Sequence, residues 1–141
     1  GKKATNKDLM LIARVESLIL NKPISDALRR ACSYIDSGAD GIMIHSRAKT
    51  PKEIFQFSKK FKKIYPNTPL VAVPSSYNKV KENQLIDNGF NIVIYANHML
   101  RASYPSMRKV ALDILKNKRS YESDNSLLSI KDILDLIPGT K

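Results

Sequence analysis

The sequence has 141 residues, of which 43% are hydrophobic and 26% are charged. This composition is that of a globular domain with a sizeable core, and it excludes a disordered or fibrous protein. A single cysteine, Cys32, excludes a disulfide framework and a cysteine zinc cluster. No apolar run approaches the roughly 20 residues of a membrane helix, and the first residues have no signal-peptide core. We expect a cytoplasmic protein without a membrane partner.

The formal net charge of +11 raises the question of a nucleic-acid partner. In TPKEIFQFSKKFKKIYP, however, the lysines fall between Ile54, Phe57, Phe61 and Ile64, which recur at the spacing of one helix face. Such lysines form the solvated face of a core helix. No zinc-finger, RRM or KH signature is present in the sequence. We therefore expect no nucleic-acid partner.

Apolar runs and helical patterns alternate from the start of the chain. The apolar run at residues 9–13 predicts a strand, and apolar residues at helical spacing predict a helix over residues 25–37. Residues 41–44 predict the second strand. Thr50, Pro51 and Glu53 then form a helix start, as the N-cap, a first-turn proline and a capping-box acid.

The helix that begins there is predicted to reach about residue 63. The alternation continues with a strand at 70–73, a helix at 80–88, a strand at 91–95 and a helix at 104–118. Four strand-helix units result. Alternation of this kind, with continuously apolar strands, indicates a parallel sheet covered by helices.

The end of the chain follows a different pattern. Residues 1–118 hold the four units, and the polar stretch RSYESDNS at 119–126 reads as a linker. Residues 127–141 form a C-terminal extension with an amphipathic helix. A helix of that length is not stable alone in water. We expect it to pack on the same barrel or on a neighbouring subunit.

Polar side chains follow every predicted strand at its carboxyl end. In an open sheet such residues gather at one switch point, whereas at the mouth of a (β/α)₈ barrel several strands contribute to one site. A barrel needs eight units and about 250 residues, so the pattern favours four units of a TIM-type barrel over a flavodoxin-like open sheet. The residues are Arg14 and Glu16, His45 and Ser46, Ser75, Ser76 and Tyr77, and Asn97 and His98.

Arg14 and His45 have the chemistry of an anion site. Strand alternation places Arg14 and Glu16 on one side, and a guanidinium fork binds a phosphoryl or carboxylate group bidentately. His45 follows the neighbouring strand and can donate a second hydrogen bond to the same group. Ser46 points away from His45. The alternative is structural: Arg14 and Glu16 pair with each other at the rim, and His45 is a satisfied imidazole.

Four motifs, one at each predicted strand, resemble the second half of the phosphoenolpyruvate phosphomutases, members of the isocitrate lyase superfamily. The resemblance spans roughly residues 8–118, and SIKDILDLIPGTK resembles the C-terminal extension of that family. The motifs are IARVESLI, GADGIMIHSRAK, LVAVPSSY and VIYANHMLRASYPSM.

This resemblance implies the second half of a (β/α)₈ barrel with a C-terminal helix. Arg14 and His45 match the pair that holds the migrating phosphoryl group, and Ser46 and Asn97 are further candidates for substrate binding. The resemblance implies Mg²⁺ as cofactor, with its acidic ligands in the missing N-terminal half and none in this segment. It also implies a homo-oligomer, a dimer or tetramer, with an exchanged terminal helix.

The activity implied is that of an isomerase of phosphonate biosynthesis, which interconverts phosphoenolpyruvate and phosphonopyruvate. The segment alone is expected to be inactive. A phosphonopyruvate hydrolase and a carbon–carbon lyase of the 2-methylisocitrate type remain as alternatives. So does a non-enzyme, either an inactive half-barrel fragment or an α/β module that binds an anion.

Overall fold

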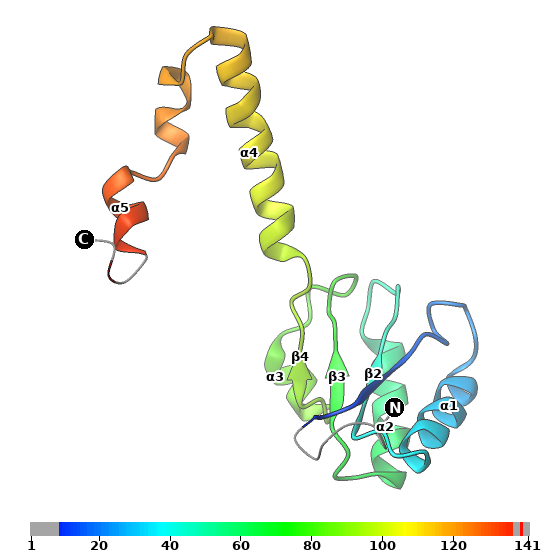
Figure 1. Ribbon diagram of the computed structural model, residues 1–141. Coiled ribbons are helices and arrows are strands. Elements are labelled where there is room, and N and C mark those ends of the chain that lie inside the picture. Colours follow the sequence, from blue (N-terminus) through cyan, green and yellow to red (C-terminus); the bar gives the residue numbers. More distant parts are fainter. Residues whose placement is uncertain (1–8, 137–138, 140–141) are drawn as a thin grey trace. The chain divides into compact units, whose positions relative to one another are not determined.

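The computed structural model of the protein describes residues 9–136 and 139. These residues form two units, Gly1–Ala96 and Asn97–Lys141. The first unit contains the sheet and its helices, and the second contains helices only (Figure 1). Each unit is described by itself.

The sheet of the first unit has four parallel strands. They are β1 (Ile12–Val15), β2 (Gly41–Ile44), β3 (Leu70–Ala72) and β4 (Ile92–Val93). The strands lie side by side in chain order, β1-β2-β3-β4. The predicted parallel sheet is therefore confirmed, and so is the adjacency of consecutive strands. Because each crossover contains a helix, all carboxyl ends of the strands meet at one edge of the sheet.

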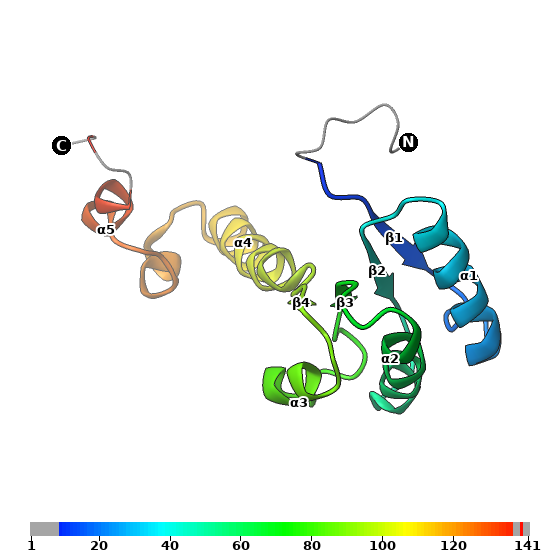
Figure 2. The ribbon, with the colours of Figure 1, turned by 90° about the horizontal axis from the view of Figure 1, so that it is seen from below.

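Three helices cover one face of this sheet (Figure 2). They are α1 (Ile24–Asp36), α2 (Lys52–Ile64) and α3 (Glu82–Asp87). Ile42 and Ile44 of β2 are fully buried, whereas Met43 between them is only partly buried. Alternate side chains of a strand point to opposite faces, so the helices bury one face. No helix of the described first unit covers the other.

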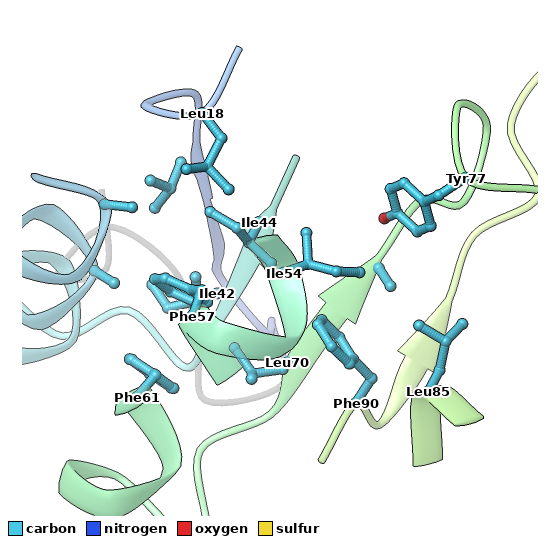
Figure 3. Packing of buried hydrophobic residues seen from close by; sticks show 14 residues of the cluster. Leu18, Ile42, Ile44, Ile54, Phe57, Phe61, Leu70, Tyr77, Leu85 and Phe90 are labelled. Atoms are coloured by element: carbon cyan, nitrogen blue, oxygen red, sulfur yellow. The ribbon is translucent and has the colours of Figure 1, made fainter. Parts of the chain in front are cut away.

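The core lies between the sheet and the helices (Figure 3). Phe57 and Phe61 of α2 stack at 5.6 Å between ring centroids. The backbone is closely packed at the start of β2, since a Cβ on Gly41 would come within 2.6 Å of Ile12 Cδ1 and 3.0 Å of the Pro69 carbonyl oxygen. The largest fully buried apolar side chains are Tyr77, Phe57, Phe61, Ile42, Ile44, Ile54, Leu70, Leu85, Val15 and Val71.

Helix α2 differs from its prediction in two details. Ile54, Phe57 and Phe61 are buried and most of the lysines are exposed, as predicted, but Ile64 is 57% exposed at the end of the helix. The predicted capping box is wrong. The N-cap is Pro51, without a side-chain cap, because the Glu53 carboxylate accepts a hydrogen bond from Ser46 instead.

The first strand lies further along the chain than predicted. The apolar run begins at Leu9, but β1 begins at Ile12, which pairs with Gly41 of β2. β1 thus begins where its pairing with β2 begins. The apolar run alone does not show this starting residue. Arg14 consequently lies inside the strand, opposite Met43, rather than after its end.

The second unit contains α4 (His98–Asn117), a 3₁₀ helix η2 (Tyr121–Ser126) and α5 (Ile130–Asp135). Helix α4 begins six residues before the predicted position 104 and continues through Pro105. The stretch predicted as a linker contains η2. The predicted C-terminal helix is present as the shorter α5, and the last predicted residues lie partly outside the described ones.

Apolar side chains of this second unit are largely exposed. Helix α4 has no buried residue. Met107 and Ile114 stand among the apolar positions whose helical spacing predicted an inward face for residues 104–118, yet they are 60% and 40% exposed. Helices this apolar on one side ordinarily pack against a partner. Within the described residues, no helix combines the length and the apolarity that crossing a bilayer requires.

Candidate active site at the carboxyl ends of β1 and β2

Arg14 of β1 and His45, which directly follows β2, lie on the face that the helices leave uncovered. Arg14 pairs in register with Met43, and His45 follows two residues after Met43 on the same side of the strand. Val15 and Ile44, which alternate with them, are buried toward the helices. The structure therefore brings Arg14 and His45 together on one face of two adjacent strands.

Arg14 is held by the next residue on its own side of the strand. Its Nε donates a hydrogen bond to Oε1 of Glu16 within an ion pair. The two side chains are 53% and 40% exposed in this chain. The bond occupies the Nε–H, and Nη1 and Nη2 take no part in it. The fork that these two nitrogens form matches two oxygens of a carboxylate or phosphoryl group.

His45 is partly buried, and its environment favours the neutral imidazole. Burial lowers the pKa of His45 below its ordinary value of 6.5, and the charges of Arg14 and Arg47 lower it further, against the opposing effect of Glu16. The imidazole is therefore neutral at pH 7 and has one N–H to donate. Among the described residues, Nδ1 of His45 is buried without a hydrogen-bond partner.

Ser46 turns to the opposite side, as strand alternation predicts. It is 1% exposed. Its hydroxyl donates to Oε2 of Glu53 at 2.7 Å and accepts from the Ala48 backbone N–H at 3.0 Å. Its hydroxyl is thus engaged with the loop and with α2. Asn97, the other candidate for substrate binding, belongs to the second unit, where it precedes α4 with a left-handed backbone (φ 64°).

The residues after β3 divide between surface and core. Tyr77 is 1% exposed and packs in the hydrophobic cluster. Burial raises the pKa of Tyr77 to about 12, so its hydroxyl keeps its proton at neutral pH. Ser75 is exposed and Ser76 is partly exposed. We therefore treat Tyr77 as a core residue.

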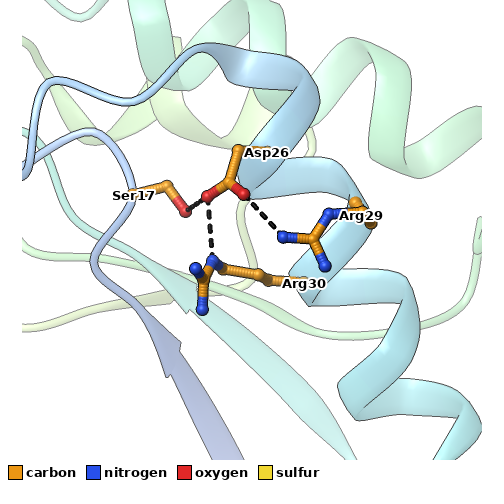
Figure 4. Close-up of polar contacts among 4 residues, drawn as sticks. All are labelled: Ser17, Asp26, Arg29 and Arg30. Atoms are coloured by element: carbon orange, nitrogen blue, oxygen red, sulfur yellow. Dashed lines mark hydrogen bonds and ion pairs between the residues drawn. The ribbon is translucent and has the colours of Figure 1, made fainter.

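The loop after β1 is fixed by a cluster that the sequence reasoning missed (Figure 4). The Asp26 carboxylate accepts hydrogen bonds from Ser17 Oγ at 2.7 Å, Arg29 Nη2 at 2.7 Å and Arg30 Nε at 2.8 Å. These bonds, that of Arg30 foremost, hold the pKa of Asp26 well below its usual value. The spacing of Asp26 to Arg29 and Arg30, i to i+3 and i+4, was a usable signal.

This cluster lies next to the Arg14 pair. A cavity of about 170 Å³ is lined by Arg14, Glu16, Asp26 and Arg30, among others. Ser17 follows Glu16 directly, so its bond to Asp26 ties the end of β1 to the first turn of α1. The site is therefore supported on its outer side by a charged network.

A divalent metal does not fit the described part of the chain. No three side chains of the types His, Cys, Asp and Glu gather there in a way that could hold a metal ion. Glu16 would lie opposite His45 if the register of β1 and β2 continued by one residue. Its carboxylate is paired with Arg14. The described residues offer cationic and neutral hydrogen-bond donors to an anion.

Comparisons with known proteins identify the family of this chain. The family model of phosphoenolpyruvate phosphomutase matches residues 1–115. The phosphonopyruvate hydrolase of Variovorax sp. (strain Pal2) is 39% identical over 132 residues, which are 93% of this chain and 44% of that protein. The chain therefore spans less than half the length of this curated relative.

Solved structures of a mutase and a hydrolase superpose on this chain. The phosphoenolpyruvate phosphomutase of Streptomyces platensis subsp. rosaceus superposes with a TM-score of 0.86 at 32% identity, over 96% of this chain and 46% of that one. Phosphonopyruvate hydrolase in complex with oxalate and Mg²⁺ superposes with a TM-score of 0.82 at 38% identity, over 96% and 47%.

The predicted fold class is confirmed, because the four parallel βα units match about half of these TIM-barrel relatives. The resemblance found in the sequence motifs is confirmed as well, since the family model covers most of the chain. The chain belongs to the phosphoenolpyruvate phosphomutase family.

Proposed function

We propose that the full-length protein is an isomerase that interconverts phosphoenolpyruvate and phosphonopyruvate, as a phosphoenolpyruvate phosphomutase. One observation carries the proposal: Arg14 and His45 lie on one face of adjacent strands, close enough for the charge of Arg14 to lower the pKa of His45. Both residues stand in motifs that resemble those of the mutases, and a mutase superposes on nearly the whole chain.

The reaction needs transfer of a phosphoryl group without gain or loss of atoms. In the direction of phosphoenolpyruvate, the carbon–phosphorus bond breaks and a bond forms from phosphorus to the enolate oxygen. No water, proton or electron enters. Phosphoryl transfer of this kind passes through a loose transition state with charge on three equatorial oxygens, and it is accelerated by positioning and electrostatic stabilisation.

Arg14 and His45 supply those two contributions. The Nη1 and Nη2 fork of Arg14 binds two phosphoryl oxygens, while Glu16 holds the guanidinium through Nε. The neutral imidazole of His45 donates one hydrogen bond to a phosphoryl oxygen. Held from two strands, the group turns between carbon and oxygen without escaping to water.

Mg²⁺ is part of the proposal only for the full-length protein. A bound divalent ion would neutralise charge on the enolate and carboxylate of the substrate. The described residues have no carboxylate cluster for it, so its ligands would come from the part of the barrel outside this chain. By the same reasoning, the 141-residue segment alone would be inactive.

A phosphonopyruvate hydrolase is the second candidate, and a specific observation favours it. The Variovorax hydrolase is 39% identical to this chain, against 32% for the superposed mutase. Both reactions start from phosphonopyruvate and use the same contacts with the phosphoryl group. They differ in whether water accepts that group. Residues that admit or exclude water would lie mainly in the other half of the barrel.

We also propose that the protein is a homo-oligomer, a dimer or tetramer, in which the C-terminal helices pack on a second copy. Large apolar side chains of α4 and α5, such as Leu115 and Ile130, are 64% and 77% exposed in this chain. Burying them against another subunit would remove apolar area from water. A cytoplasmic location rests on the one free cysteine and stays a prediction.

The test is a product assay on the full-length protein with phosphonopyruvate and Mg²⁺. The proposal predicts that phosphoenolpyruvate accumulates while pyruvate and inorganic phosphate do not. Equal amounts of pyruvate and phosphate would support the hydrolase and overturn the mutase. Lack of any turnover by folded protein would overturn both.

A further inference from the structure

Ser46 is a buried polar residue directly beside the proposed catalytic histidine. It is 1% exposed, and its hydroxyl takes part in two hydrogen bonds. It donates to Glu53 Oε2 at 2.7 Å, and it accepts from the backbone N–H of Ala48 at 3.0 Å. The first bond reaches the first turn of α2, and the second closes the backbone turn that follows Ser46.

These two bonds fix both ends of the loop between β2 and α2. The loop begins at His45, directly after β2, and ends where α2 begins at Lys52. A loop of this kind without internal bonds would be among the more mobile parts of the fold. With Ser46 anchored on the helix side, His45 is directed to the opposite face, where Arg14 lies.

The hydrogen bond between Ser46 and Ala48 also restrains Arg47. Arg47 stands between Ser46 and Ala48, the two residues that the second bond connects, and its side chain is exposed. Its charge lowers the pKa of His45. The loop thus carries a second cation two residues after the histidine.

We propose that Ser46 and Glu53 form a positioning pair, which holds the β2–α2 loop so that His45 and Arg47 face the phosphoryl site together with Arg14. This role rests on the proposed function for its effect on turnover. It differs from direct substrate binding by Ser46, because the hydroxyl is turned into the fold and already bonded on both sides. Glu53 acts through Ser46 and does not touch substrate.

A purely structural role is the competing explanation, and Ser58 provides the matched control. Ser58 also belongs to the buried side of α2 and is 0% exposed. Its hydroxyl donates to the Asn88 carbonyl at 2.5 Å, and this bond ties α2 to the end of α3. Removing either hydroxyl costs a buried hydrogen bond. Only the removal of Ser46 frees the loop that carries His45.

The experiment uses the full-length protein with the variants Ser46→Ala, Glu53→Ala, Glu53→Gln and Ser58→Ala. Four quantities are measured on each: the melting temperature, kcat for phosphonopyruvate, KM for phosphonopyruvate, and the pKa of the His45 imidazole by NMR titration. Glu53→Gln keeps an acceptor oxygen for Ser46. It therefore tests the bond without the loss of side-chain volume that could unfold Glu53→Ala.

We expect Ser46→Ala and Glu53→Ala to lower kcat at least tenfold and to move the His45 pKa, with Glu53→Gln recovering most of both. We expect Ser58→Ala to lower the melting temperature while leaving kcat and the His45 pKa unchanged. If Ser46→Ala resembles Ser58→Ala in melting temperature, kcat and His45 pKa, the pair is only structural and the proposal is wrong.

The titration separates this proposal from the proposed function. If the wild-type protein does not turn over phosphonopyruvate, the proposed function fails. A shift of the His45 pKa in Ser46→Ala, absent in Ser58→Ala, would still support the positioning pair. An unshifted pKa in both variants would overturn it without reference to activity.

Discussion

The guanidinium of Arg14 and the carboxylate of Glu16 form a hydrogen-bonded ion pair two residues apart on one side of β1. Both side chains are about half exposed in this chain. Exposed pairs of this kind contribute only about 0–1 kcal/mol to stability. The pair therefore contributes little to the stability of the rim. Under the proposed function, its role is to orient the guanidinium for the phosphoryl group.

Arg14→Ala in the full-length protein should reduce turnover of phosphonopyruvate by about a hundredfold or more, since a charge-assisted grip on a transition state is worth on the order of 3 kcal/mol. Arg14→Lys should not restore it, because the ammonium lacks the fork. Melting temperature and kcat measured on the same samples check this. Arg119→Ala, which removes another exposed guanidinium paired with a carboxylate, is the control. Normal turnover by folded Arg14→Ala would refute the catalytic assignment.

Charge substitutions around His45 should move its pKa in opposite directions. Glu16 raises the pKa of His45, while Arg14 and Arg47 lower it. Glu16→Gln should therefore lower it further, and Arg47→Gln should raise it toward the ordinary value. The measurement is an NMR titration of the imidazole, with His45→Gln to assign the signal. Shifts of the same sign in the two variants would contradict the arrangement of charges described above.

The Asp26 cluster should make stability depend on pH in the acid range. The folded pKa of Asp26 lies below the unfolded value of about 3.9. The ionised carboxylate therefore stabilises the fold fully above that value, and the contribution is lost as the pH falls through the folded pKa.

Asp26→Asn should accordingly be less stable than the wild type at pH 7, and the difference should shrink as the pH falls below about 4. Urea unfolding at pH 7 and at pH 3 measures it. A difference that is the same at both pH values would show that the variant loses packing or hydrogen-bond geometry and not the charge.

Two apolar residues of α2 should differ sharply in their effect on stability. Phe57 is fully buried and stacks on Phe61, so Phe57→Ala should reduce the free energy of unfolding by about 3–5 kcal/mol. Ile64 is 57% exposed, and Ile64→Ala should change it by no more than about 0.5 kcal/mol. Denaturant unfolding of the two variants provides the comparison. Similar losses would mean that Ile64 is packed as the sequence pattern predicted.

The parallel sheet and its strand order could be predicted because they follow from alternation along the chain. Buried strands such as Leu70–Ala72 read as continuous apolar runs, and short crossovers place consecutive strands side by side. The start of β1 could not be predicted in the same way. Leu9 is as apolar as Ile12, but only Ile12 has a partner in β2, at Gly41.

The site was predictable where it depends on a strand and was missed where it depends on tertiary bonds. Arg14 and His45 follow from the period of two in β-strands. Glu53 fitted a local capping rule, yet its carboxylate bonds to Ser46 in the preceding loop. The helical residue Met107 fitted an inward-facing pattern, yet it is 60% exposed in this chain. A local sequence pattern indicates that a side chain needs a hydrogen-bond or packing partner, but it does not identify which residue provides it.

In the proposed reaction, the phosphoryl group held by Arg14 and His45 moves from carbon to the enolate oxygen and not to water. Running the full-length enzyme with phosphonopyruvate and Mg²⁺ in water enriched in oxygen-18, and analysing the phosphorus products by mass spectrometry, tests this most directly. We expect phosphoenolpyruvate whose three non-bridging phosphoryl oxygens carry no oxygen-18, and no labelled phosphate. The bridging oxygen derives from the keto group, which exchanges with water, and is therefore left out of the comparison. Inorganic phosphate carrying one oxygen-18 atom, formed together with pyruvate, would contradict it.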